Sequence, residues 1–375
     1  MAEQQPSVKA WSHFTPPFPS TLSQIDVSPP SPSQLGDTEI LVELYSASLN
    51  PVDVQLVNLP IFKLPALQGH RGLGKDFAGK VLAKGSKVVG EYSVEDEVMG
   101  VTINPLGGAI TGTLSQVSLI DTTRSCIVPK PTHLTFPEAA SLPLVFLTAV
   151  PCLSPPYLQL PAPSSSSRPT IVVLGGSSAA GIYTIQYATL KLGLRVIATC
   201  STRNKAFVES LGVSHVVDYT TESIADRLRE LRPSEGYISI VDCVGGTELL
   251  NSGIWTELLH PRSGQLREGG SYVTIVGDKT SRSRLGGSMT NYWTTSQMWR
   301  SWKGWFGWCP RYYCISLNME KKEWLEQVGA LVKEKGMKVV IDSEFGFDEV
   351  EKAFERLNSG KATGKVVVNV KNTSR

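Results

Sequence analysis

The stretch TIVVLGGSSAAGIYTIQYATLKLGLRVIATCS, residues 170–201, decides the fold of this chain. It opens with the apolar, mostly β-branched run 171–174, which is typical of a strand buried on both faces. A turn of small residues follows at 175–181. Apolar residues at helical spacing then lead to Gly193, and a second apolar run covers 194–199. This order of strand, glycine turn, helix and strand predicts part of a doubly wound parallel α/β sheet.

The glycine turn predicts a phosphate-binding site. A pyrophosphate binds the free N–H groups of a helix N-terminus, and a side chain at the turn would block its approach. Gly175, Ser178 and Gly181 keep the spacing of the dinucleotide-binding pattern, with serine in the middle place. An ordinary glycine turn is the alternative, but the surrounding strands and helix favour a cofactor. The predicted contacts are Gly175, Ser177, Ser178, Ala179, Ala180 and Gly181.

The end of the second strand indicates which nicotinamide cofactor binds. A site for NADH usually carries an acidic residue about 20 residues beyond the glycines. Here that region reads TCST at 199–202, followed by Arg203 and Lys205. Basic side chains can pair with the 2′-phosphate of NADPH, so we predict NADPH, with contacts from Ser201, Arg203 and Lys205. The alternative is that both basic residues lie on a solvated helix turn.

Composition excludes several classes of protein. The chain has 375 residues, about the length of two domains, and a net charge of +2, which excludes a nucleic-acid footprint. Its six cysteines form no C-x-x-C pair, so we expect neither a structural zinc lobe nor a disulfide framework. No apolar run is long enough to span a bilayer. The first residues resemble neither a secretory signal nor a transit peptide, so we expect the cytoplasm, with mitochondria as a less favoured alternative.

The flanking regions follow other patterns. Short strands and turns up to about residue 130 predict an all-β, barrel-like domain, in which Asn50 and Asp53 form a turn at a strand end. Residues 136–148 begin as a helix, and residues 320–335 read as one amphipathic helix. The Trp-rich segment from Trp293 to Trp308 has partly helical spacing. It is interpreted as a wall over an apolar ligand, a subunit or domain contact, or a weak lipid-surface contact.

Five ordered motifs together resemble one enzyme family, the medium-chain dehydrogenase/reductases, in the zinc-free quinone oxidoreductase (zeta-crystallin-like) branch. Residues 302–313 and the tail 345–370 give a closer likeness to the reticulon-interacting oxidoreductases and their fungal relatives. The motifs are SLNPVD at 48–53, GKDFAGKV at 74–81, FPEAASLPL at 136–144, GGSSAAG at 175–181 and GKATGKVVV at 360–368.

The resemblance implies a domain plan and the absence of a metal site. A GroES-like β-barrel domain would be built from both chain ends, residues 1–143 and 321–375, with a Rossmann NADPH-binding domain at 144–320. Zinc-dependent members carry Cys before the first motif and Gly-His-Glu in the second. Here the second motif begins Gly-Lys-Asp at 74–76 and no Cys lies near Asn50, so Lewis-acid chemistry by zinc has no ligand set.

The resemblance also implies an activity: hydride transfer from NADPH to a quinone or an α,β-unsaturated carbonyl. A small apolar acceptor would bind beside Asn50 and Asp53, which are the catalytic candidates. A homodimer is a possible assembly of this protein. Relatives often carry Tyr two places after Asp53, where this chain has Gln55. One alternative is therefore an enoyl reductase of polyketide or fatty-acid metabolism. Another is a non-catalytic nucleotide-binding protein at a lipid surface or partner. Further cofactor contacts implied are Tyr219, Val276, Gly277 and Lys365.

Overall fold

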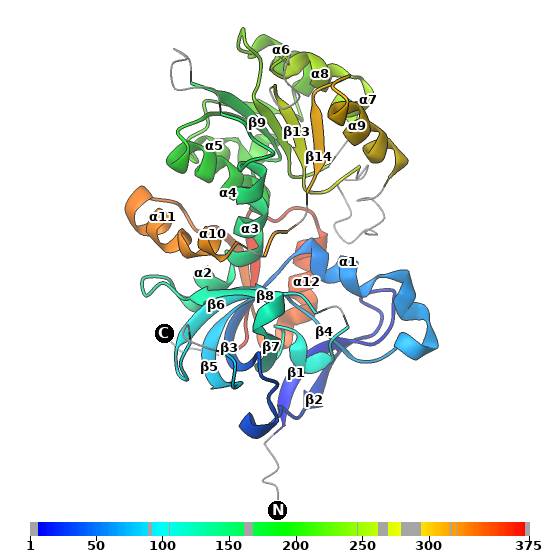
Figure 1. Ribbon diagram of the computed structural model, residues 1–375, viewed down its shortest axis with the longest axis vertical. Helices are drawn as coiled ribbons and strands as arrows, with labels where there is room; N and C mark the ends of the chain where they lie inside the picture. Colours follow the sequence, from blue (N-terminus) through cyan, green and yellow to red (C-terminus); the bar gives the residue numbers. More distant parts are fainter. Residues whose placement is uncertain are drawn as a thin grey trace, which may run out of the picture.

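The chain folds into two bodies, one α/β and one rich in β-strands, which are stacked along the long axis of the molecule (Figure 1). The computed structural model describes residues 7–88, 92–104, 106–160, 168–245, 247–261, 269–278, 294–315, 317–319 and 321–371. A parallel sheet with helices on both faces forms one body, and a mixed, barrel-like sheet forms the other. The predicted fold class, a Rossmann-type sheet with a barrel built from both chain ends, is thus confirmed.

The parallel sheet has six strands in the order β11-β10-β9-β12-β13-β14. The order reverses between β9 and β12, and ligands of such sheets bind outside the carboxyl ends at that switch point. All five residues of β9 are buried, as its continuous apolar run predicts. The strands are β9 (Thr170–Leu174), β10 (Arg195–Cys200), β11 (His215–Asp218), β12 (Ser239–Asp242), β13 (Ser271–Thr274) and β14 (Arg311–Cys314).

Helices cover both faces of this sheet. Ile171 and Val173 point into the core shared with α3 and α4, whereas Val172 and Leu174 point into the core shared with α6, α7 and α8. The helices are α3 (Pro143–Cys152), α4 (Ala179–Gln186) with a π-helical turn at Tyr187–Lys191, α5 (Lys205–Glu209), α6 (Ile224–Glu230), α7 (Glu248–Asn251), α8 (Ile254–Leu258) and α9 (Thr295–Trp305). Within the described ranges, no helix has the length and apolar character needed to cross a membrane.

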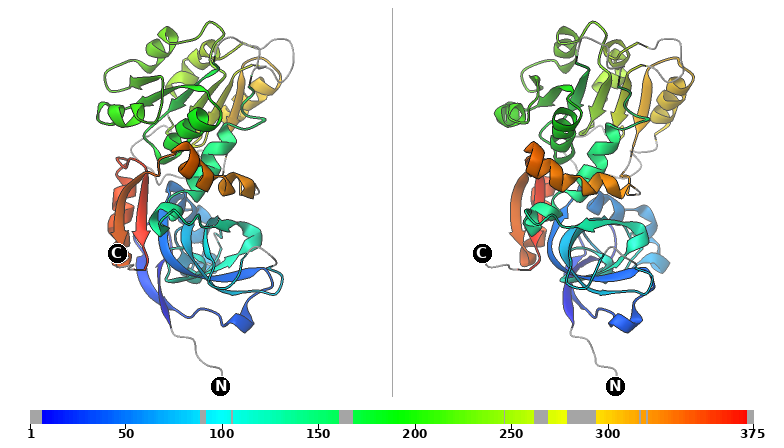
Figure 2. Two further views of the ribbon diagram at one scale, coloured as in Figure 1. Left: turned by 90° about the vertical axis from the view of Figure 1, so that its left-hand side faces the viewer. Right: turned by 60° about the vertical axis from the view of Figure 1, so that its left-hand side comes forward.

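The barrel-like body joins the two ends of the chain. Strand β16 pairs antiparallel with β3, with Val366 opposite Leu49, so the C-terminal strands lie against the N-terminal ones (Figure 2). The mixed sheet runs β15 (Ile341–Gly346), β16 (Lys365–Asn369), β3 (Glu39–Leu49), β5 (Asp76–Lys84), β6 (Glu97–Thr102) and β8 (Ser125–Pro129), with β7 (Val117–Asp121) beside β3. A small sheet holds β2 (Leu22–Val27), β1 (Val8–His13) and β4 (Arg71–Gly72).

Three helical segments differ from the sequence prediction. Residues 136–148 form two helices, α2 (Phe136–Ala140) and α3, because Pro143 lacks the N–H that would continue the first one. The segment from 320 to 335 is likewise divided into α10 (Lys322–Glu326) and α11 (Val328–Lys335), and Glu320 lies outside the described residues. The turn expected at Asn50 is the start of helix α1 (Pro51–Val57). Helix α12 covers Val350–Asn358.

Candidate active site

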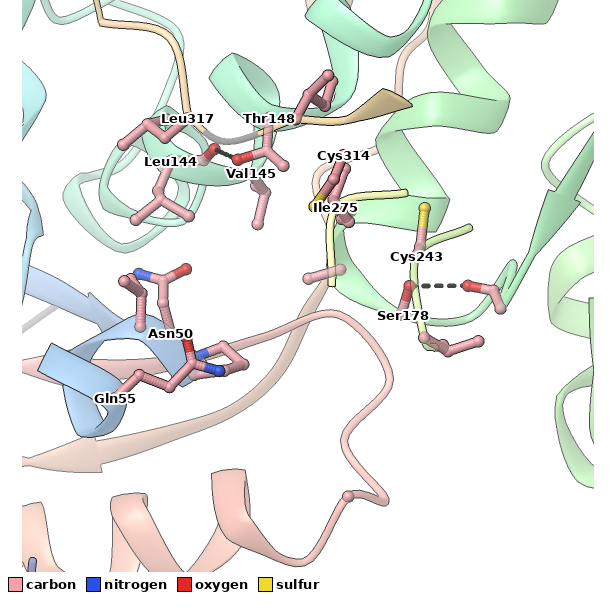
Figure 3. A pocket seen from close by; sticks show the side chains of 18 of the residues that line it. Asn50, Gln55, Leu144, Val145, Thr148, Ser178, Cys243, Ile275, Cys314 and Leu317 are labelled. Atoms are coloured by element: carbon pink, nitrogen blue, oxygen red, sulfur yellow. Dashed lines mark hydrogen bonds between the residues drawn. The ribbon is translucent and has the colours of Figure 1, made fainter. Parts of the chain in front are cut away.

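A cavity of about 1220 Å³ lies between the two bodies, at the carboxyl ends of the parallel strands. Ser178, Cys243 and Cys314 line it from the parallel sheet, and Asn50 and Gln55 line it from the barrel-like body (Figure 3). A typical site for one small molecule measures roughly 300–1,000 Å³. The cavity is therefore large enough for a cofactor together with a second ligand.

The glycine turn after β9 forms one wall of this cavity. Gly175 has a φ of 85°, and a Cβ on Gly181 would lie 2.2 Å from the carbonyl oxygen of Gly175. Ser178 is the N-cap of α4: its Oγ accepts from the Gly181 amide at 3.1 Å and donates to the Gly175 carbonyl at 2.7 Å. Ser177, Ser178, Ala179 and Ala180 line the cavity together with Gly175, whereas Gly181 lies behind them.

Of the two basic residues after β10 that were predicted to bind the cofactor, one lines the cavity and the other does not. Ser201 and Arg203 line the cavity, as does Tyr219 after β11, but Lys205 does not. Arg203 Nη2 donates to the carbonyl of Lys361 at 2.8 Å, so its guanidinium is held near the loop before β16. The structure thus brings Arg203, Ser201 and Tyr219 together and sets Lys205 apart.

One buried carboxylate, Asp218, lies near this end without lining the cavity. Its oxygens accept from Thr202 Oγ1 at 2.5 Å and from Thr220 Oγ1 at 2.6 Å. These hydrogen bonds, first from Thr202 and then from Thr220, lower the pKa of Asp218. Its negative charge is therefore already engaged by hydroxyl groups.

Three neighbouring strands bring a charged group to the barrel side of the cavity. Lys365 begins β16, Asn50 follows β3, and Asp76 begins β5, and these strands are adjacent in the sheet. Lys365 Nζ lies 2.8 Å from Asp76 Oδ2 and 2.5 Å from Asn50 Oδ1. Asn50 Nδ2 donates to Asp76 Oδ2 at 2.9 Å, which fixes its amide oxygen toward Lys365. Asn50 and Lys365 both line the cavity.

Asp76 is the acceptor that Asn50 and Lys365 share. Besides Lys365 and Asn50, it accepts from Ser48 Oγ at 3.0 Å and from the Leu144 amide at 2.7 Å. Its side chain is fully buried. Sequence reasoning quoted Asp76 within a motif but did not assign it to the site. A charged residue directly before the apolar pair Phe77 and Ala78 at the start of this strand was the available signal.

Asp53 lies behind Asn50 and does not line the cavity. The Asp53 Oδ2 atom accepts a hydrogen bond from the backbone N–H of Asn50 at 2.7 Å. The Asp53 Oδ1 atom has no hydrogen-bond partner among the described residues. Burial raises the pKa of Asp53 to about 6, opposed by the nearby ammonium of Lys75. Burial also lowers the pKa of Lys75. Of the two catalytic candidates, Asn50 faces the cavity and Asp53 holds the backbone that carries it.

The strand ends near β13 and β14 complete the cavity. The amides of Val276 and Gly277 donate to Thr274 Oγ1 at 3.2 and 3.1 Å, and neither residue lines the cavity. Ile275 does so in their place. Sequence reasoning also missed three cavity-lining cysteines. Burial raises the pKa of the thiols of Cys200 to about 11, of Cys243 to about 12 and of Cys314 to about 11.

The donor set does not fit a metal ion. In the portion of the chain described above, no three His, Cys, Asp or Glu side chains gather closely enough to hold one. On the barrel side of the cavity, the ammonium of Lys365 and the carboxylate of Asp76 form an ion pair. Among the described residues, therefore, no set of three ligands for a catalytic zinc is gathered at the cavity.

Comparison with known proteins gives the family. A family model described as "Zinc-binding dehydrogenase" matches residues 211–368. A chloroplast envelope quinone oxidoreductase homolog of Arabidopsis thaliana is 30% identical over 92% of this chain and 93% of its own length. The trans-enoyl reductase himH of Aspergillus japonicus is 35% identical over 60% of this chain and 64% of its own length. The structure of the quinone oxidoreductase from Coxiella burnetii superposes with a TM-score of 0.74 at 25% identity, covering 98% of this chain and 100% of that one.

These matches agree with the geometry. A quinone oxidoreductase homolog is similar in sequence over 92% of this chain and a trans-enoyl reductase over 60% of it, and a solved quinone oxidoreductase shares the fold. The glycine turn at the switch point of the parallel sheet is where such folds bind a dinucleotide. The chain therefore belongs to the zinc-binding-type dehydrogenases of the medium-chain dehydrogenase/reductase family and is a nicotinamide-dependent oxidoreductase.

Proposed function

We propose that this protein transfers hydride from NADPH to a quinone or an α,β-unsaturated carbonyl, without zinc. The observation that carries the proposal is a single cavity with the glycine turn of β9–α4 on one side and the Asn50–Lys365 pair on the other. The helix N-terminus that would bind phosphate and the positive charge of Lys365 therefore face the same cavity.

NADPH fits the parallel-sheet side. Its pyrophosphate would bind the first amides of α4, at Ala179 and Ala180, because the first N–H groups of a helix have no partner within it. Arg203 would pair with the 2′-phosphate, and Tyr219 and Ser201 would lie beside the adenosine. When bound, NADPH supplies the hydride.

The barrel side fits the acceptor. Hydride addition to a quinone or enone leaves negative charge on its oxygen, and a preorganised cation stabilises such charge best where water is excluded. Lys365 uses two of its three N–H groups on Asn50 and Asp76, which leaves one for the acceptor oxygen. Lys365 Nζ then donates a hydrogen bond to that oxygen, and the proton that completes the reduction is taken from solvent. Asn50 and Asp76 orient the ammonium, and Asp53 orients Asn50.

The zinc-free part of the proposal is supported by the residues beside the cavity. A Lewis acid would stabilise the acceptor oxygen in place of Lys365. The ammonium of Lys365 performs this task with no metal, and within the described ranges no cluster of metal-ligating side chains competes for the same space.

The experiment combines cofactor binding with turnover. Binding of NADPH and of NADH is measured by nicotinamide fluorescence for the unaltered protein and for Arg203→Ala, with Lys205→Ala as a matched control of the same charge change. We expect Arg203→Ala to weaken NADPH about tenfold, the value of a charge-assisted hydrogen bond, and to leave NADH unchanged. Lys205→Ala should leave both unchanged. Equal binding of NADPH and NADH by the unaltered protein would refute the NADPH assignment.

Turnover is measured as NADPH oxidation with benzoquinones, enones and enoyl thioesters. The enoyl thioester arm tests the second candidate function, which the 35% identity to a trans-enoyl reductase favours. Oxidation with quinones or enones supports the proposal, and oxidation with enoyl thioesters alone supports the second candidate. Tight NADPH binding without oxidation by any of these acceptors would refute both.

A further inference from the structure

Helix α9 and the residues directly after it carry an exposed group of aromatic side chains, which we call the aromatic patch: Trp299, Trp302, Trp305, Phe306 and Trp308. Trp302 stacks on Trp299 with ring centroids 5.0 Å apart and meets Phe306 at 4.7 Å and Trp308 at 5.2 Å. Single exposed apolar side chains are ordinary on protein surfaces, but a contiguous patch of this kind indicates a binding surface. Trp293, which belongs to the same Trp-rich segment, lies outside the described residues.

The packing of α9 fixes which way these rings point. Gln297 and Gly304 are buried on the side that faces β14, and a Cβ on Gly304 would lie 3.0 Å from the carbonyl oxygen of Pro310. Arg300 forms an ion pair with Asp278 at 2.7 Å. With this side of the helix held against the sheet, the aromatic side chains remain on the other side.

Part of the aromatic patch continues into the candidate active site. Met298, Trp302 and Trp305 are spaced i, i+4 and i+7, so they form one stripe on the helix, and all three line the same cavity as Asn50 and Lys365. Trp308 is as exposed as Trp305, at 64%, but does not line the cavity. The stripe is therefore a wall of the cavity as well as a part of the surface.

The sheet order shows which end of the cavity this wall belongs to. Ser201 and Tyr219, at the proposed adenosine end, follow β10 and β11 on one side of the sheet. Helix α9 packs beside β14, the strand at the opposite edge (Figure 1). A dinucleotide that starts at β10 and crosses the switch point would leave the stripe free on the far side of the cavity.

The charges around the aromatic patch favour an apolar ligand over an anionic membrane. Membrane-surface helices combine aromatic residues with free basic side chains that bind anionic lipids. Here the guanidinium of Arg300 is held by Asp278 and is mostly buried, and Lys303 Nζ lies over the ring of Trp299 at 5.1 Å. Neither basic residue of α9 is thus disposed toward a phosphate surface.

We propose that the acceptor carries a long apolar chain, and that this chain lies along the stripe of Met298, Trp302 and Trp305 while the reducible head group lies beside Asn50 and Lys365. This inference rests on the proposed function and adds a substrate class to it, lipophilic quinones or enones. The occupant is a part of the substrate, so binding of a second copy or of a lipid surface to the patch is a competing outcome of the test.

The test uses two benzoquinones with the same ring, one bearing a methyl group and one a decyl chain. Their dissociation constants are measured by calorimetry on the NADP⁺-saturated full chain, in which no turnover occurs. The unaltered protein should bind the decyl compound more tightly. Trp305→Ala should reduce the ratio of the two affinities about tenfold, as expected for loss of an aromatic anchor. Trp308→Ala, with the same exposure but outside the cavity, should leave the ratio unchanged.

Three results separate the inference from the proposed function. Equal affinity for both compounds in the unaltered protein would overturn the chain-binding stripe. An equal loss in Trp305→Ala and Trp308→Ala would also overturn it, because the whole patch would then act as a surface for lipid or for a second copy. A decyl preference that depends on Trp305, with no NADPH oxidation by either quinone, would support the stripe and refute the proposed reduction.

Discussion

The buried ion pair between Lys365 and Asp76 yields the sharpest prediction for stability. Its side chains are 2% and 0% exposed and their charged atoms lie 2.8 Å apart. Removing one partner of a buried pair costs about 3–5 kcal/mol, because the other charge remains without compensation. For Lys365→Met we expect the lower value, about 3 kcal/mol, since Asp76 keeps its hydrogen bonds from Ser48, Asn50 and the Leu144 amide.

Differential scanning calorimetry measures this loss of stability as a lower melting temperature. A change of 1 kcal/mol lowers the melting temperature by about 2–4 °C in a body of 150–250 residues, so Lys365→Met should lower it by about 6–12 °C. Asp76→Asn should have a similar effect, because it leaves the ammonium of Lys365 buried beside neutral groups. The double variant Lys365→Met/Asp76→Asn should be little worse than either single one, with a coupling of about 2 kcal/mol or more.

Additivity would refute this reasoning. If the two single losses add to the double loss within about 0.5 kcal/mol, the two charges do not stabilise each other. The buried network would then be held by the hydrogen bonds of Asp76 alone. The role of Lys365 as an oriented cation in the active site would lose its structural basis.

Three other predictions concern single positions. Gly181→Ala should abolish nucleotide binding, because the added Cβ would lie 2.2 Å from the Gly175 carbonyl oxygen. The control Gly193→Ala has open space around the added Cβ and should cost only about 1 kcal/mol of stability. Equal nucleotide affinity in the two variants would contradict this prediction. Ser178→Ala should lower stability by about 1 kcal/mol through loss of the α4 cap, as measured by urea unfolding. Burial raises the pKa of Asp53 from 3.8 to about 6, so the folded state keeps a proton that the unfolded state has already released. Stability should therefore fall as pH rises from about 4 to 6, and Asp53→Asn should remove that slope; a slope that persists in this variant would contradict the assignment.

The sequence predicted those parts of the molecule that depend on local pattern. The strand–turn–helix–strand unit at 170–201 follows from apolar spacing and glycine positions, and the structure has it where expected. The approach of Lys365 to Asp76 could not be read in this way, because the residues are 289 positions apart and meet only through the pairing of β16, β3 and β5. Arg203 and Lys205 look equivalent in sequence. Only the direction of their side chains separates them.

The three cysteines that line the cavity have a consequence for the chemical durability of the protein. Quinones and enones are electrophiles that alkylate thiolates, and a molecule drawn into this cavity comes close to the sulfur atoms of Cys200, Cys243 and Cys314. The thiolate, not the thiol, is the reactive form. With pKa values of about 11, 12 and 11, only on the order of one thiol in ten thousand or fewer is ionised near pH 7. The same burial that shapes the cavity thus protects the protein from poisoning by the compounds it is proposed to reduce.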